Sequence, residues 1–211
     1  MTILKSELIG VVNGTLKRGY TGTTLDEKIT SALKDLSMRG NFLQDEFLRA
    51  TSEDRDYYSL PDNLKDLLFV GMKSSDNLTI YKPLEYERFA MYKRNIYYSS
   101  TTGTPTRYTW KSRYMYPRPI PDKVYNMYLW YSYIHPETFT IDEETVKACD
   151  NILFADTYRK AIELRLLYEV AEGLNLDDAK KYDTLYLLDE IPKLRANIKT
   201  EPLVARYRDG F

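Results

Sequence analysis

Cysteine and histidine are almost absent from this chain of 211 residues, which contains one residue of each type. The single cysteine, Cys149, excludes an intramolecular disulfide and is typical of a protein that folds in a reducing cytoplasm. One cysteine and one histidine, His135, cannot make up the Cys and His sets of a zinc site. Disulfide-stapled scaffolds and zinc modules are therefore excluded.

Long hydrophobic runs and an excess of charge are also missing. No apolar run reaches the roughly 18 residues that a membrane span needs. Lys5 and Glu7 interrupt the apolar N-terminus, and no small-residue cleavage pattern follows, so no signal peptide is expected. The net charge is -1 and the pI about 6.0, whereas dedicated nucleic-acid binders are basic. These absences predict a protein without a membrane partner that stays in solution inside a cell.

Tyrosine, in contrast, is abundant, with 20 residues in the chain. Tyr joins a large apolar face to a polar tip at a low cost in rotamer entropy, so it is favoured at half-buried protein interfaces. For any single Tyr, filling the core of a barrel or sandwich is an equally good interpretation. The total favours a protein that assembles with others.

The N-terminal quarter has helical periodicity. Apolar spacing predicts a helix over residues 3–17. A second helix is expected to begin at Thr24, which forms a capping-box pattern with Glu27, and to end at Gly40. Its expected buried residues are Leu25, Ile29, Leu33 and Leu36. A further short helix is expected at residues 42–50.

The middle of the chain changes to strand periodicity. Residues 57–63 predict a short strand that ends in a turn, because Pro and Asp favour turns. Further strands are expected at residues 64–72, 78–81, 107–111, 113–116 and 123–133. Residues 83–94 are ambiguous, with a short helix preferred. The last strand is apolar on both faces, which predicts that both are covered.

Helical periodicity returns at Thr140, which forms a second capping-box pattern with Glu143. The first part of this helix is expected to bury Val146, Cys149, Ile152 and Leu153. The helical face continues to Gly173, and Asn175 is expected to cap a last helix that Pro192 interrupts.

This order of elements predicts an α+β fold in which N-terminal and C-terminal helices flank an inserted antiparallel β unit. A single domain is expected, with N-terminal helices in 1–52, a β unit in 53–136, C-terminal helices in 137–199 and an extended arm in 200–211.

Basic and aromatic residues are interleaved in residues 88–118, which contain seven basic residues and no acidic one. Single-strand binders combine cations and rings in this way, so a nucleic-acid-binding module is the alternative function. Against it, strand alternation places Arg107 and Lys111 on one face and Tyr108 and Trp110 on the other. The preferred interpretation is a sheet with a cationic outer face and an aromatic inner face.

No catalytic, cofactor-binding or metal-binding residue is assigned. His135 precedes a proline and has no nucleophile motif beside it, so a structural or interfacial role is favoured. Residues 103–105 form a turn rather than a phosphate-binding loop, because no Gly-Lys-Ser/Thr follows. A hydrolase with a carboxylate pair that no motif reveals remains a competing class.

One stretch, residues 101–136, resembles a known family. Gly103 and Pro105 precede Tyr108, Tyr116-Pro117-x-Pro119-x-x-Asp122 follows, and a strand ends in Tyr131-x-Tyr133-x-His135-Pro136. These positions, with the corner at residues 59–61, resemble the head-to-tail adaptor (connector) proteins of tailed bacteriophages. The family often has Gly in the hairpin where this chain has residues 111–113.

The resemblance implies a virion structural protein without enzymatic activity or cofactor. It would form a ring, usually of twelve copies, between the portal protein and the tail proteins, with DNA passing transiently through the lumen. Its location would be the neck of the virion, after assembly in the cytoplasm of the host bacterium.

Two contact regions are expected for such a ring. Residues 137–201 contain fifteen acidic and nine basic residues, so they could complement a basic patch on the β unit of a neighbouring subunit. The expected subunit interface consists of Arg107, Lys111, Arg113, Tyr114 and Arg118. The expected portal-binding arm uses Leu203, Val204, Tyr207 and Phe211, which are unusually apolar for a solvated tail.

Overall fold

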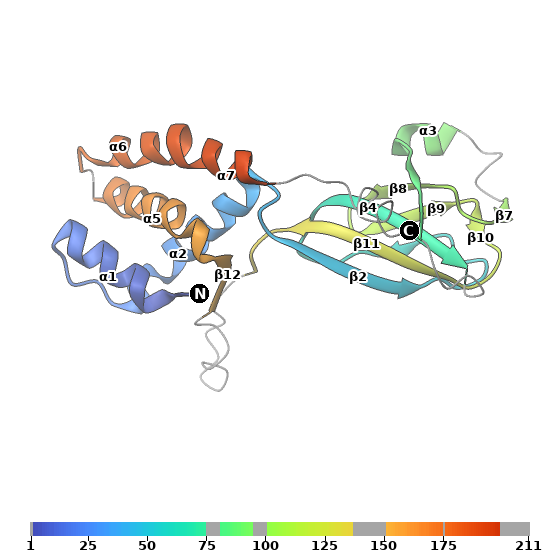
Figure 1. The fold of residues 1–211 in the computed structure, drawn as a ribbon, viewed down its shortest axis with the longest axis horizontal. Helices are drawn as coiled ribbons and strands as arrows, with labels where there is room; N and C mark the ends of the chain where they lie inside the picture. Colours follow the sequence, from blue (N-terminus) through green and yellow to red (C-terminus); the bar gives the residue numbers. More distant parts are fainter. Residues whose placement is uncertain (1, 75–80, 95–100, 137–150, 175, 199–211) are drawn as a thin grey trace, which may run out of the picture. The chain divides into compact units, whose positions relative to one another are not determined.

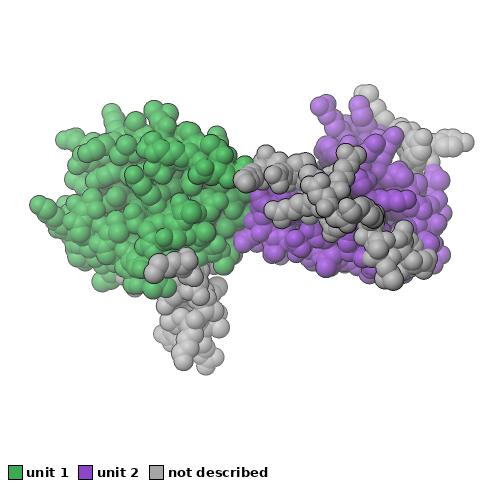
Figure 2. Space-filling model, in the orientation of Figure 1, with its two compact units in different colours: residues 1–43, 134–201 green, residues 44–133, 202–211 purple. Residues whose placement is uncertain are grey.

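The computed structural model describes residues 2–74, 81–94, 101–136, 151–174 and 176–198. Helices and sheets occur together, so the α+β class is confirmed (Figure 1). The chain forms two compact units (Figure 2): the described residues of unit 1 fall within Met1–Leu43 and Ile134–Glu201, and those of unit 2 within Gln44–Tyr133. The β unit thus begins at residue 44 rather than at the expected 53.

Unit 1 is mainly helical. Its elements are β1 (Thr2–Leu4), α1 (Lys5–Leu16), α2 (Gly22–Arg39), β12 (Asn151–Ala155), the 3-10 turn η1 (Asp156–Tyr158), α5 (Arg159–Gly173), α6 (Ala179–Thr184), the π-helical η2 (Leu185–Glu190) and α7 (Ile191–Asn197). The four predicted apolar residues of α2 are all buried. They pack in a core with α5, whose buried residues are Ala161, Ile162, Leu164, Leu166, Leu167, Val170 and Ala171.

The helix starts differ from the capping boxes expected in the sequence. Thr24 lies inside α2, and its hydroxyl donates to the carbonyl of Thr21 at 2.9 Å. A carboxylate instead caps α1, where Glu7 accepts the Leu4 amide at 3.1 Å. The second predicted capping box, at Thr140, lies outside the described residues, as does Asn175.

Two predicted helical segments are strands. Residues 44–50 form β2 (Gln44–Ala50), which pairs antiparallel with β11 along its whole length. Residues 151–155 form β12, which pairs with β1. In β12 Ile152 and Phe154 are buried whereas Leu153 is exposed, so burial alternates with a period of two. In a segment of only five residues, the apolar pattern of the sequence does not distinguish this period from that of a helix. Pairing with a distant strand decided both segments.

Pro192 lies in the first turn of α7, directly after the π-helical residues of η2. Proline has no amide hydrogen to donate to the preceding turn. The interruption expected at Pro192 is therefore seen as a change from π-helix to α-helix between Glu190 and Ile191.

Unit 2 contains two four-stranded sheets. The first has the order β2-β11-β4-β5, with β4 (Leu64–Ser74), β5 (Lys82–Pro83) and β11 (Tyr125–Tyr133); the second has the order β3-β9-β8-β6, with β3 (Tyr58–Ser59), β6 (Glu85–Tyr86), β8 (Arg107–Lys111) and β9 (Tyr114–Arg118). The expected strands at 64–72, 107–111, 113–116 and 123–133 are confirmed to within a few residues. A helix, α3 (Phe89–Arg94), occupies part of the ambiguous segment 83–94.

Side chains from both sheets form one core. Met127 and Leu129 of β11 and Val70 of β4 lie in the same buried cluster as Tyr108 and Met115 of the second sheet. The opposite face of β11 is only half-buried, so the prediction that both faces are covered is right for one of them.

Two strand pairs depart from an all-antiparallel unit. β6 runs parallel to β8, and a short pair of β7 (Thr102–Gly103) with β10 (Ile120–Pro121) is also parallel. Pro117 of β9 lies beyond the end of β3, which pairs only with Tyr114 and Met115. Pro117 has no amide hydrogen, but on the side of β9 that faces β3 no described strand lies opposite it to accept a hydrogen bond. This is the position expected for a proline in a strand, where its side of the strand is an edge.

Candidate functional site

Aromatic and basic side chains share the outer face of the second sheet. The register of β8 with β9 pairs Lys111 with Tyr114 and Thr109 with Tyr116. Directly opposite residues of an antiparallel pair project to the same face. Within β8 the predicted separation is confirmed, since Arg107 and Lys111 are exposed whereas Tyr108 and Trp110 pack in or against the core. For the sheet as a whole it is wrong, because β9 adds Tyr114 and Tyr116 to the cationic face.

Four rings form a continuous row on this face. Tyr57 contacts Tyr114 edge to face, with centroids 5.4 Å apart, and Tyr116 at 6.4 Å. Phe89 of α3 extends the row, since its ring lies 5.9 Å from that of Tyr116. Tyr57 and Tyr114 are each 43% exposed. We call the surface formed by Tyr57, Phe89, Tyr114, Tyr116 and the cations beside them the aromatic-cation face.

The cations of this face are held at its margins. Lys111 Nζ lies 4.8 Å from the centre of the Phe89 ring, and the guanidinium of Arg55 lies 5.6 Å from that of Tyr57. Arg113 pairs with Asp62 at 2.9 Å and Arg107 with Glu85 at 3.7 Å, both in exposed positions. Exposed ion pairs contribute little free energy, so both arginines can exchange their partners for those of another molecule.

Arg118 does not belong to this surface. The structure places its side chain inside unit 2, with 5% of its area exposed, which corrects its assignment to a subunit interface. Burial lowers its pKa, against the nearby charges of Asp56 and Glu87, which raise it. Arg118 also lines a small hollow of about 230 Å³ with Glu87, Thr106, Arg107 and Pro119.

The structure changes which rings could stack on a ligand. Trp110 packs against the core cluster on the inner face, so it is not a stacking residue as the nucleic-acid alternative supposed. Tyr57 and Arg55 were missed by the sequence analysis. What could not be foreseen is the pairing of β3 with β9.

His135 has a structural role in unit 1. Its ring is 2% exposed, its Nε2 accepts the Leu153 amide at 3.1 Å, and its Nδ1 donates to the Pro136 carbonyl at 2.9 Å. The ring stacks on Phe154, with centroids 5.7 Å apart. Burial lowers the pKa of His135 and so favours the neutral imidazole. Nε2 thus connects the segment after β11 with β12, while Nδ1 bonds within that segment.

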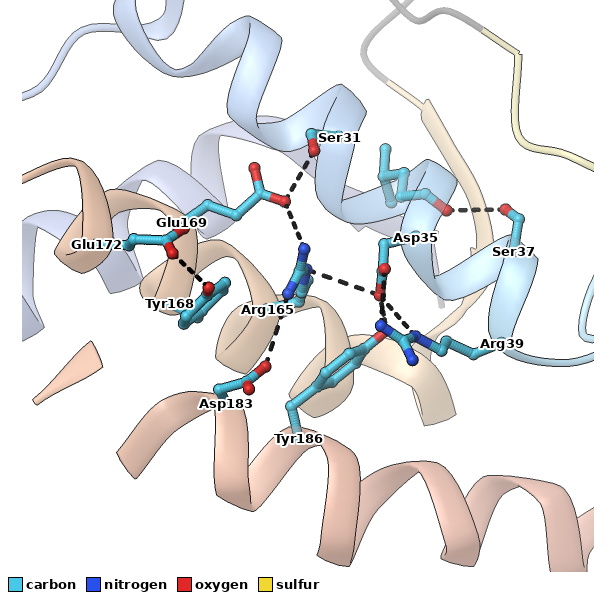
Figure 3. A network of polar contacts seen from close by, with 11 residues as sticks. Ser31, Asp35, Ser37, Arg39, Arg165, Tyr168, Glu169, Glu172, Asp183 and Tyr186 are labelled. Carbon is cyan, nitrogen blue, oxygen red and sulfur yellow. Dashed lines mark hydrogen bonds and ion pairs between the residues drawn. The ribbon is translucent and has the colours of Figure 1, made fainter. Parts of the chain in front are cut away.

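A polar network connects the helices of unit 1 (Figure 3). Arg165 of α5 lies 3.6 Å from Asp35, 3.3 Å from Glu169 and 3.6 Å from Asp183. The Tyr186 hydroxyl donates to Asp35 at 2.8 Å. Although burial acts to raise it, the bonds from Arg39 and Tyr186 hold the pKa of Asp35 below its ordinary value. Because each of these groups has a partner within the network, we interpret it as a cross-link between helices.

Several predicted features lie beyond what the structure describes. The arm residues Leu203, Val204, Tyr207 and Phe211 are outside the described residues, and so are Tyr97 and Tyr98 of the basic segment. Within the described ranges, no cluster of His, Cys, Asp and Glu could hold a metal ion. No helix in those ranges is both long and apolar enough to span a bilayer.

Comparison with models of protein families finds no match for the sequence, and comparison with curated proteins finds no relative. The resemblance to phage adaptors therefore depends on the motifs in residues 101–136 and stays a prediction.

Proposed function

We propose that this chain is the subunit of a ring that joins the portal to the tail in a tailed bacteriophage. The observation that supports it is the aromatic-cation face, where Tyr57 and Tyr114 stay exposed beside Lys111 and Arg113. Tyr and Arg are enriched in protein interfaces, whereas exposed rings in a row are uncommon on a monomer. The face would contact a neighbouring subunit.

The acidic region that could pair with this face is smaller than the sequence suggested. Residues 151–198 carry nine acidic and seven basic residues, which is nearly balanced. Exposed acids gather near the turn after α5, at Glu172, Asp177 and Asp178. The remaining acidic excess is concentrated in residues 137–150, outside the described residues.

The test is native mass spectrometry of the full chain, alone and with the portal protein encoded in the same genome. We expect closed rings, and fewer of them when Lys111→Glu and Arg113→Glu are combined, since interface charge selects partner and register. The matched control is Lys82→Glu with Lys123→Glu, which changes the net charge equally at exposed positions of unit 2 outside the aromatic-cation face. A chain that stays monomeric with its portal would refute the proposal, and equal effects of the two pairs would refute the role of the face.

A second candidate is binding of single-stranded nucleic acid, favoured by one observation: rings and cations share a surface. Stacking on exposed rings contributes about 1–3 kcal/mol per base. Binding of a fluorescent oligonucleotide at about 0.15 M salt should then weaken more than tenfold when Tyr57→Ala and Tyr114→Ala are combined, which a loss of about 1.4 kcal/mol already gives. Tyr133→Ala, a half-buried Tyr of the other sheet, is the control.

A further inference from the structure

The outer edge of β2 is open in the described part of the chain. β2 is the first strand in the order β2-β11-β4-β5, and no described strand pairs with its other side. Figure 1 shows β2 along one border of this sheet. An edge strand presents amide and carbonyl groups that can pair with another chain.

The orientation of these groups follows from the ladder. The amide of Thr51 donates to the Tyr125 carbonyl at 2.8 Å, so residue 51 faces β11. Since donors alternate along an antiparallel strand, the amides of Phe47 and Arg49 also face β11. The amides of Leu48 and Ala50 therefore face outward.

The usual protections of an edge cover only the start of β2. Asp45 accepts the amide of Glu46 at 2.8 Å, which blocks one donor. Farther along, residues 47–50 contain no Pro and no Lys, and Leu48 is 64% exposed. The only charged group there, Arg49, turns its guanidinium to Ser59, donating to its hydroxyl at 2.8 Å.

The C-terminal segment of the chain has the pattern of a strand that fits this edge. In residues 203–208, Leu203, Ala205 and Tyr207 alternate with Val204, Arg206 and Arg208. Six residues equal the length of residues 45–50. Leu203 and Tyr207 can lie beside Leu48 on the outer face, which places the two arginines on the other face of the strand, beside the exposed Asp45.

We infer that residues 203–208 of one copy add as a strand to β2 of a second copy. Main-chain bonds to Leu48 and Ala50 supply affinity, and the alternating side chains supply specificity. The inference rests on the proposed ring for its partner, because arm and edge are different surfaces, and a contact between different surfaces forms a ring when its rotation closes.

The test is hydrogen exchange of the full-length protein at several concentrations, read at the amides of Leu48 and Ala50. Exchange of these amides should slow by about tenfold or more as copies associate, since a paired amide exchanges only on opening. Two arm variants, Val204→Pro and Ala205→Pro, then remove neighbouring donors that point to opposite sides. One variant should abolish the protection and the other should leave it largely intact.

Any other exchange result overturns the inference. If the amides of Leu48 and Ala50 exchange freely at all concentrations, no strand pairs with the edge of β2. If they are protected to the same degree at all concentrations, the pairing strand belongs to the same chain. Equal protection in both proline variants, or equal loss, excludes strand pairing by the arm. Native mass spectra of the same samples separate this result from the proposed function: rings without protection at β2 refute only the inference, and protection in open chains or dimers refutes only the ring.

Discussion

At the scale of single residues, His135 shows how a buried ring can make folding depend on pH. Leu153 donates to Nε2, so the proton of the neutral ring is on Nδ1. A second proton on Nε2 would face the amide hydrogen of Leu153 and would have to be buried as charge. The lowered pKa of His135 has this physical origin in burial.

We therefore expect stability to fall in mildly acidic solution. The pKa of His135 is lower in the folded chain than in the unfolded chain, so as the pH falls the unfolded chain binds the proton first. The contribution of His135 to stability is therefore fully present above about pH 6.5 and decreases below it. The decrease is at most about 1.4 kcal/mol per pH unit and ends once the pH is below the folded-state pKa. Urea unfolding of wild type and His135→Gln, whose amide oxygen can accept from Leu153 without titrating, measures this. An identical pH slope in both proteins would contradict the assignment.

Ser112 occupies a backbone conformation that favours glycine. It lies in the two-residue loop between β8 and β9 with a φ of 54°. Ser112→Gly should raise the free energy of unfolding by up to about 1 kcal/mol, because left-handed φ costs a residue with a Cβ about that much. Ser112→Ala keeps the Cβ and removes the hydroxyl, so thermal melting should show no gain for it; a gain from Ala as well would assign the effect to the hydroxyl.

At the scale of secondary-structure elements, Arg165 joins α2, α5 and α6 through three carboxylates. Its side chain is 17% exposed and that of Asp35 20%. Arg165→Met should lower the free energy of unfolding by about 2–3 kcal/mol, since it leaves partly buried carboxylates without their cation. Lys193→Met is the control and should change chemical unfolding little, because it removes an exposed pair with Asp189 and leaves Glu190 paired with Lys160 at 3.5 Å. Equal losses would show that burial does not matter here.

At the scale of the whole molecule, the near-zero net charge limits binding to DNA. With a charge of -1 and a few cations on one face, we expect only weak, sequence-independent binding, with a dissociation constant no tighter than about 10⁻⁶ M at physiological salt. Titration of duplex oligonucleotides between about 0.05 and 0.2 M salt should show affinity falling with salt. Tight binding that persists at the higher salt would contradict the proposed ring, in which DNA only passes through.

Local chemistry was enough to predict the α+β class, the strand at 107–111 and the buried face of α2. In these segments the helical or strand periodicity extends over enough residues that a single residue out of pattern does not change the prediction. The turn residues around Pro61 and Pro117 likewise act locally, through a fixed φ and a missing donor.

Only the tertiary structure decided which segments pair, and with that which side chains share a face. Residues 44–50 and 151–155 became strands because partners far along the chain completed their hydrogen bonds. The aromatic-cation face exists because β9 lies beside β8 in one register, and a shift by one residue would turn Tyr114 to the core. Alternation within one strand is a property of the sequence, whereas register between strands depends on long-range packing that no short window contains.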